Sequence, residues 1–221
     1  MTPAFVIGLL GAESTGKTTL AQQIAEALRS ERHSVALVGE YLREFCVQQG
    51  RTPTMAEQRA IADEQSRRID AAAHDHPIVV ADTPALMVAV YSDMVFLDKS
   101  LYAPAAAAHA RCDLTLLTAL DMPWVADGLQ REGPHVREPV DRLVRAALQA
   151  AQLPYAVVAG SGERRFAAAM QAVRHGLQMP SADDESAANP RWQWVCERCG
   201  DANCERHLLP RTPSGPNCDL L

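Results

Sequence analysis

The chain has 221 residues, of which 48% are hydrophobic and 22% charged, and its formal net charge is −6. This composition allows one α/β domain of ordinary size plus a small appendage, and the acidic balance argues against general affinity for nucleic acid or membrane surfaces. No stretch approaches the roughly 20 apolar residues that a membrane helix needs. We therefore expect a cytoplasmic protein whose six cysteines are thiols or metal ligands.

Short apolar runs alternate with helical stretches in the part of the chain before residue 180. Strands are predicted at residues 5–10, 34–39, 77–82, 112–117 and 155–159. Helices are predicted at residues 16–30, 54–74, 84–96, 136–151 and 162–177, with a short Ala-rich helix at 103–110. This alternation is typical of an α/β fold, a five-stranded parallel sheet with helices on both faces. Ligands of such sheets gather at the carboxyl ends of the strands.

A complete G-x-x-x-x-G-K-[ST] phosphate-binding loop follows the first predicted strand and leads into the first predicted helix. In that order, loop N–H groups and the helix N-terminus face the phosphates of a nucleoside triphosphate. Lys17 is expected to reach the β- and γ-phosphates of ATP, and the Thr18 hydroxyl to bind Mg²⁺. Glu13 is either a solvated acid or a partner for a basic lid or substrate group. The predicted phosphate-binding residues are Gly11, Ala12, Glu13, Ser14, Thr15, Gly16, Lys17, Thr18 and Thr19.

Two acidic residues end the second and third predicted strands. Glu40 is a candidate base that takes the proton of an acceptor hydroxyl, or else a surface residue that caps the next helix. Asp82 is a candidate Mg²⁺ or substrate ligand and also a candidate base, and a helix cap before Pro84 is compatible with these roles. The sequence leaves the choice of base open. Arg131 and Arg137 flank a Gly-Pro turn and are predicted to form a mobile lid that closes on ATP.

The composition changes after residue 179. A small, acidic segment bounded by prolines is typical of a linker, and a Cys-rich segment follows it. Three cysteines and one histidine have the spacing of a structural Zn²⁺ site, with a redox C-x-x-C pair or an unmetallated tail as the alternatives. The predicted ligands are Cys196, Cys199, Cys204 and His207. We expect a P-loop domain at residues 1–179, a linker at 180–190, a zinc module and candidate protein-contact element at 191–209, and a flexible tail at 210–221.

Three phrases occur together in the order and spacing of a known family. They are Gly-Ala-Glu-Ser-Thr-Gly-Lys-Thr-Thr-Leu at 11–20, Glu-Tyr-Leu-Arg-Glu at 40–44 and Asp-Met-Pro-Trp-Val-Ala-Asp-Gly-Leu at 121–129. Over about residues 4–178 the chain resembles the ribosylnicotinamide kinase domain of the NadR-like P-loop ATPase family. The resemblance implies a nucleoside-kinase-like fold and transfer of the ATP γ-phosphate to the 5′-hydroxyl of nicotinamide riboside, which gives nicotinamide mononucleotide.

The same resemblance implies a substrate site. Trp124 would stack on the nicotinamide, Asp82 would hold the ribose hydroxyls, and Glu40, Tyr41 and Asp127 would complete the site. The competing hypothesis is a regulatory or partner-coupled P-loop ATPase that uses the Cys-rich module for protein contacts. A zinc-dependent nucleic-acid-binding ATPase is less compatible with the acidic charge of the chain.

Overall fold

The structure is a computed structural model, and it describes residues 3–125 and 133–178. By its internal contacts the chain divides into two units, Met1–Met179 and Pro180–Leu221, and all described residues belong to the first. The predicted linker, zinc module and tail lie outside the described residues.

Short apolar runs form one parallel sheet. The strands are β1 (Phe5–Leu10), β2 (Val35–Val38), β3 (Ile78–Asp82), β4 (Leu114–Thr118) and β5 (Ala156–Val158). Their order is β2-β3-β1-β4-β5, so β1 and β3 lie in the interior of the sheet and are buried on both faces. The pairing aligns Leu9 with Asp82 and Val38 with Ala81. The loop after β1 therefore emerges beside the carboxyl ends of β2 and β3.

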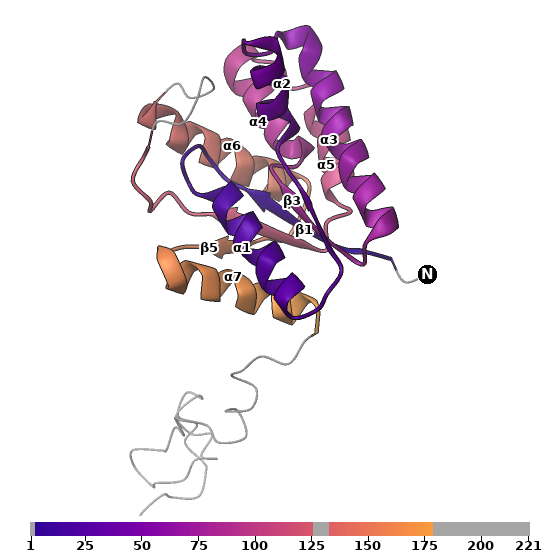
Figure 1. Cartoon of the computed structure of the whole chain (residues 1–221). Coiled ribbons are helices and arrows are strands. Elements are labelled where there is room, and N and C mark those ends of the chain that lie inside the picture. The colour runs from indigo at the N-terminus through magenta and orange to yellow at the C-terminus, as the bar shows by residue number, and fades with distance from the viewer. Residues whose placement is uncertain (1–2, 126–132, 179–221) are drawn as a thin grey trace, which may run out of the picture. The chain divides into compact units, whose positions relative to one another are not determined.

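Helices cover both faces of this sheet (Figure 1). They are α1 (Lys17–Ser30), α2 (Tyr41–Gln49), α3 (Met55–Asp75), α4 (Ala85–Phe96), α5 (Tyr102–His109), α6 (Arg137–Ala150) and α7 (Gly162–Gly176), with a short 3₁₀-helix at Pro134–Val136. Ile7 and Leu9 of β1 pack against α1 and α7 on one face. Leu10 packs on the other face, in a core completed by the remaining five α-helices. Successive side chains of a strand point to opposite faces, so β1 contributes to both cores.

The helix α4 is buried over most of its surface because its sequence is apolar around most of the helix circumference. It packs against α3, α5 and α6. Near its C-terminal end, Tyr91, Val95 and Phe96 line a cavity. None of the helices in the described part of the chain is both long enough and apolar enough to span a membrane.

Every predicted strand and helix is present, with ends that differ from the prediction by at most two residues. The parallel five-stranded sheet of the predicted fold class is confirmed. The helix α2 was absent from the predicted elements. Only Leu42 and Cys46 of its nine residues are buried, which is too short an apolar pattern to identify a helix, and its packing against α3 stabilises it.

Candidate active site

The phosphate-binding loop connects β1 to α1 as predicted, and two glycines are required for its shape. Gly11 has a φ of 149°, and a Cβ built there would lie 1.9 Å from the Thr118 hydroxyl oxygen, so a side chain would prevent the loop from packing against β4. Gly16 precedes α1 with a left-handed φ of 72°. Thr18 and Thr19 are exposed in the first turn of α1, where backbone N–H groups have no partner inside the helix. This helix end favours an anion.

Hydroxyl and ammonium groups stabilise the inside of the loop. The Thr15 side chain is 1% exposed, and its hydroxyl donates to the Ala12 carbonyl at 2.8 Å and lies 2.7 Å from the Thr118 hydroxyl. The Lys17 Nζ also donates to the Ala12 carbonyl, at 2.8 Å. The lysine therefore lies over the loop, in the position from which a P-loop lysine reaches phosphate.

Arg165 of α7 connects the phosphate-binding loop to the ends of β4 and β5. Its guanidinium is almost fully buried and donates to the carbonyls of Thr15 and Gly160. It also lies 3.4 Å from a carboxylate oxygen of Asp121, whose other oxygen accepts the Gly160 N–H. Burial lowers the pKa of Arg165, and Asp121 opposes that shift. This side chain fixes the loop to the sheet.

The structure brings Glu40, Asp82 and Lys17 together at the carboxyl edge of the sheet. Burial raises the pKa of Glu40, the nearby Lys17 lowers it, and the nearby Asp82 raises it again. The Glu40 side chain is 12% exposed and forms an ion pair with Arg43 at 3.4 Å. Asp82 is 2% exposed, and one of its carboxylate oxygens accepts the Thr83 hydroxyl at 3.0 Å. This arrangement is consistent with the prediction that Glu40 and Asp82 lie close together beside the phosphate-binding loop.

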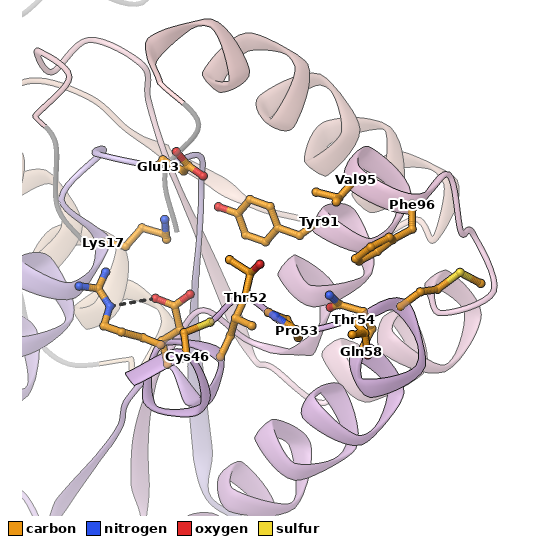
Figure 2. Close-up of a pocket in the computed structure, with 14 residues that line it drawn as sticks. Glu13, Lys17, Cys46, Thr52, Pro53, Thr54, Gln58, Tyr91, Val95 and Phe96 are labelled. Atoms are coloured by element: carbon orange, nitrogen blue, oxygen red, sulfur yellow. Dashed lines mark hydrogen bonds and ion pairs between the residues drawn. The ribbon is translucent and has the colours of Figure 1, made fainter. Parts of the chain in front are cut away.

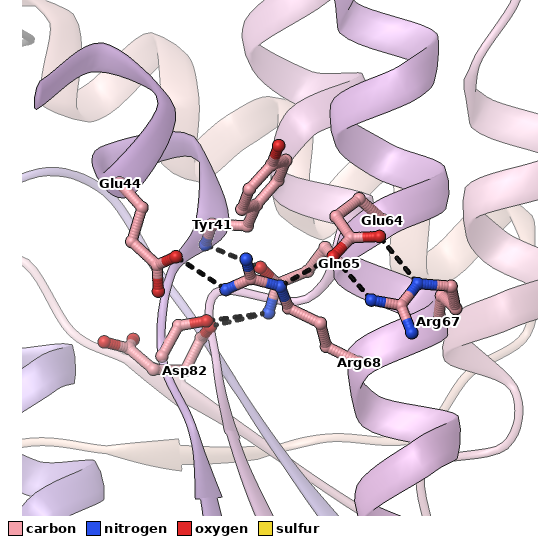
Figure 3. Close-up of polar contacts among 8 residues, drawn as sticks. Tyr41, Glu44, Glu64, Gln65, Arg67, Arg68 and Asp82 are labelled. Carbon is pink, nitrogen blue, oxygen red and sulfur yellow. Dashed lines mark hydrogen bonds and ion pairs between the residues drawn. The ribbon is translucent and has the colours of Figure 1, made fainter. Parts of the chain in front are cut away.

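Gln65 of α3 holds the two strand ends in place (Figure 3). Its side chain is 1% exposed. Its carbonyl oxygen accepts the Tyr41 N–H at 2.7 Å, and its amide donates to the Gly39 carbonyl at 3.1 Å and to the Asp82 carbonyl at 3.4 Å. These bonds flank Glu40 on both sides along the chain and connect it to β3. Sequence reasoning missed Gln65, although a glutamine on the apolar face of a predicted helix was an available signal.

Tyr41 is partly buried and packs against the core to which α2 to α6 contribute. The guanidinium carbon of Arg68 lies 4.3 Å from the centroid of the Tyr41 ring, and Figure 3 shows the two side chains next to each other. Arg68 also forms ion pairs with Glu44 at 2.7 Å and Glu64 at 2.9 Å. Tyr41 is not among the described residues that line the cavity, so its predicted contact with substrate stays a prediction.

A cavity of about 590 Å³ begins at the phosphate-binding loop and extends between α2, the start of α3 and the end of α4. Figure 2 shows Lys17 and Glu13 at one end and Phe96 and Gln58 toward the other, with the Tyr91 ring between them. The cavity therefore has a charged end, next to the loop and Glu40, and a mostly apolar end. Its volume is in the range of small-molecule sites.

Glu13 is one of the residues at the charged end. It is 8% exposed, which excludes the interpretation as a solvated acid that points away from the site. The alternative, a partner for a substrate group or a basic lid, remains. Sequence reasoning missed the cavity itself, because its walls come from three helices that are separated along the chain.

A family model described as an AAA domain matches residues 6–165. The chain belongs to this AAA domain family. No protein of curated function matches the sequence significantly. The fold of the AAA domain is similar to that of two crystal structures of NadR protein, one in complex with NAD and AMP-PNP (TM-score 0.65) and one in complex with NR (TM-score 0.66), each at 20% sequence identity. The alignments cover 80% of this chain but only 51% and 52% of the NadR chains, so the chain spans about half of their length.

The sequence resemblance implied a P-loop fold, and the family match and the NadR structures confirm that fold for the AAA domain. Of the phrase at 121–129 that carried the resemblance, the structure describes residues 121–125, and this part contacts the phosphate-binding loop, since the Val125 N–H donates to the Ser14 hydroxyl at 3.1 Å. Trp124 is half-buried, and its indole N–H is buried without a hydrogen-bond partner among the described residues. It is not one of the described residues that line the cavity, so its stacking on the base stays a prediction.

Arg137 of the AAA domain anchors the same segment. It is 8% exposed and donates to the carbonyls of Met122 at 2.8 Å and Leu120 at 3.4 Å. Both terminal guanidinium nitrogens of Arg137 thus bond to backbone carbonyls. This buried position differs from the exposed position expected of a lid residue. Its predicted partner Arg131 lies outside the described residues, as does Asp127. The lid stays a prediction.

Proposed function

We propose that this AAA domain is a nucleoside kinase that transfers the γ-phosphoryl group of ATP to a 5′-hydroxyl, with nicotinamide riboside as the acceptor. The observation that carries the proposal is the cavity, because both Lys17 of the phosphate-binding loop and Glu40 line it. An ATPase needs room for water next to the γ-phosphate, whereas a kinase needs a second compartment of substrate size. The NadR structures, which contain NR or NAD with AMP-PNP, support the choice of nucleoside.

The donor half of the site is the phosphate-binding loop. The loop N–H groups and the start of α1 would hold the β- and γ-phosphates, and Lys17 would exchange the Ala12 carbonyl for a phosphate oxygen. The Thr18 hydroxyl and the Asp82 carboxylate are the oxygen ligands that Mg²⁺ prefers, and they would hold the ion. Bound Mg²⁺ would neutralise charge on the phosphate oxygens.

The acceptor half begins at Glu40. In the transfer, the acceptor hydroxyl oxygen bonds to the γ-phosphorus, the bond from that phosphorus to the bridging oxygen of ADP breaks, and the hydroxyl proton moves to a carboxylate. The raised pKa of Glu40 makes its carboxylate a better proton acceptor than an ordinary glutamate. We assign the base role to Glu40 because it lines the cavity, whereas Asp82 is not among the described lining residues.

The nucleoside base would lie at the apolar end of the cavity. Tyr91 and Phe96 present aromatic rings there (Figure 2). Aromatic faces suit a planar ring, and attraction is stronger when that ring is cationic, as in a pyridinium nucleoside.

Turnover of the full chain with MgATP tests the proposal. Nicotinamide riboside, adenosine, uridine and cytidine are offered separately, and ADP and nucleoside monophosphate are quantified by chromatography. We expect stoichiometric nicotinamide mononucleotide and ADP. If no nucleoside accelerates ADP release but a protein does, the partner-coupled ATPase replaces the kinase.

The two lysines of the chain provide a matched pair of variants. Lys17→Ala should lower turnover by at least about 10³-fold, because it removes the cation at the transferring phosphate. Lys99→Ala, at an exposed site just after α4, should retain wild-type turnover. Equal activity of the two variants would show that the observed turnover does not come from this loop.

We also propose that the segment at 191–209 holds one structural Zn²⁺ through Cys196, Cys199, Cys204 and His207. Three thiols and one imidazole form a donor set that suits tetrahedral zinc, and binding of the ion would contribute folding free energy to a short segment.

A further inference from the structure

Gln58 belongs to the wall of the cavity and carries a buried hydrogen-bond acceptor that has no partner among the described residues. The residue lies in the first turns of α3, is 4% exposed and lines the cavity. Its side-chain carbonyl oxygen is buried and has no hydrogen-bond partner within the described part of the chain. Buried polar atoms nearly always have a partner, and one without a partner is destabilising. An orphaned acceptor in a cavity wall therefore points to a ligand that supplies an N–H or O–H group.

The position of Gln58 shows which part of the acceptor it would meet. Lys17, beside which the proposed transfer takes place, lies at the opposite end of the cavity (Figure 2), and Glu40 lies close to Lys17. Phe96 and Thr54 are near Gln58 in the same view. A nucleoside whose 5′-hydroxyl lies at Glu40 would therefore direct its base, and the substituent on that base, toward Gln58.

The carboxylate of Glu57, which precedes Gln58 in the chain, already has partners that compensate its charge. Glu57 accepts hydrogen bonds from the Thr54 N–H and hydroxyl, both at 2.8 Å, and forms a two-bond ion pair with Arg51 at 2.7 and 2.8 Å. These contacts lower the pKa of Glu57 to about 2, the bonds to Arg51 having the largest effect, so the carboxylate stays ionised. Its negative charge stands at the N-terminus of α3 and reduces the attraction of that helix end for a second anion.

We infer that Gln58 determines specificity for a neutral carboxamide on the base, by accepting the amide N–H through its side-chain carbonyl oxygen. The inference rests on the proposed kinase function and extends it to the substituent that the site selects. A carboxylate at the same position has no hydrogen to donate, so two oxygens would face each other, and its charge would be buried without a partner. A methyl ketone has no charge but also no donor, so it isolates the effect of the hydrogen bond.

Competing ribosides test this inference on the full chain. Wild-type protein receives MgATP with nicotinamide riboside, nicotinic acid riboside or 3-acetylpyridine riboside, and kcat/KM is measured for each. We expect the amide to exceed both the acid and the ketone by about tenfold or more, since the ketone leaves the buried acceptor unpaired. Gln58→Met, which is similar in shape but replaces the carbonyl oxygen by a weakly accepting thioether sulfur, should bring the amide-to-ketone ratio to within about threefold of unity.

Two further variants keep the test decisive. Gln58→Glu retains an acceptor oxygen, so it should keep the preference for amide over ketone and reject the acid more strongly. Gln48→Met, at an exposed position of α2, should keep the wild-type ratio. Thermal unfolding adds a structural control: Gln58→Met should be at least as stable as wild type, because it removes an unpaired buried oxygen.

The outcomes separate the two proposals. If wild-type protein phosphorylates the ribosides but the amide-to-ketone ratio is unity, or is the same in Gln58→Met, the inference about Gln58 is wrong and the kinase function stands. If no riboside is phosphorylated by wild-type protein, the proposed function fails and the inference fails with it.

Discussion

At the scale of single residues, the site brings the carboxylates of Glu40 and Asp82 together where burial disfavours the ionised form of Glu40. The Glu40 side chain is only 12% exposed and lies near Asp82, and its partial burial is the main reason that its pKa is raised. A raised pKa means that the folded protein binds the Glu40 proton more tightly than the unfolded chain does. The protonated form therefore favours folding, and this contribution is lost as pH rises through the folded-state pKa. A pKa that is raised by burial and by a neighbouring carboxylate is typical of functional carboxylates.

Glu40→Gln should separate stability from activity. The neutral amide avoids the buried charge, so the thermal midpoint at pH 7.5 should rise, while kcat should fall by about 10²-fold or more because the proton acceptor is lost. Differential scanning calorimetry and steady-state turnover measure the two effects. Glu26→Gln, at an exposed position of α1, should change neither quantity. A variant with lower stability and unchanged kcat would contradict both the burial argument and the role as base.

The pH profile distinguishes Glu40 from Asp82 as the base. The kcat/KM of wild type should fall as pH decreases through the Glu40 pKa, which lies above the ordinary value of 4.5. This acidic limb should disappear in Glu40→Gln and persist, at lower overall activity, in Asp82→Asn. The reverse pattern would assign the proton to Asp82.

At the scale of elements, α3 stabilises the site at two points along one face. Gln58 and Gln65 are seven residues apart, about two helical turns, so both point in the same direction from the helix. Gln58 contributes to the cavity wall, and Gln65 bonds to the chain on both sides of Glu40 and to Asp82. The buried face of one helix thereby positions groups that follow two strands.

Gln65→Leu should damage both the fold and the reaction. The substitution leaves a backbone N–H and two carbonyls without their bonds, so we expect the free energy of unfolding to fall by about 2–4 kcal/mol. We expect kcat to fall by about tenfold or more while the KM for ATP changes little, because the carboxylates move and the loop does not. Urea unfolding and steady-state kinetics measure these effects. Gln149→Leu, exposed on α6, is the control; an equal loss there would exclude a specific role for Gln65.

The adjacent arginines of α7 form a second matched pair. Arg165→Met removes the bonds to Thr15 and Gly160, so it should lower stability by about 2–3 kcal/mol and raise the KM for ATP by about tenfold through the loosened loop. Arg164→Met, which is exposed, should stay within about 0.5 kcal/mol of wild type. If the two variants have equal KM values for ATP, Arg165 does not hold the loop.

At the scale of the whole molecule, the AAA domain match covers residues 6–165, and the predicted Cys-rich module begins only at residue 191. The module can therefore be tested separately from the proposed kinase site. Metal analysis of the full chain should give about one zinc per chain, and Cys199→Ser should lose it because the site then lacks one of four ligands. Cys46→Ala, a change in the buried core of the domain, should keep the zinc. Equal zinc content in the two variants would contradict the predicted site.

The sequence by itself determined the order of the strands and of every α-helix except α2, the phosphate-binding loop between β1 and α1, and the acidic residues just after β2 and at the end of β3. Local patterns predict these features: an apolar run predicts a strand, a fixed spacing of glycines predicts the loop, and a carboxylate after a strand predicts a site residue. A parallel sheet then brings strand ends to one edge, which is why the meeting of Glu40, Asp82 and Lys17 could be predicted.

Only the tertiary structure showed the cavity that we propose as the acceptor side of the site. The cavity is formed by α2, α3 and α4, and its volume depends on how far these helices lie apart, which no local pattern encodes. The same holds for Gln65, whose three partners lie 17 to 26 residues away along the chain, and for Arg165, whose partner Thr15 is 150 residues away. A polar side chain on a helix can hold a distant segment in place, as Gln65 does, only when the fold brings that backbone next to it. It can act on substrate specificity, as we propose for Gln58, only when the fold places it in the wall of a cavity.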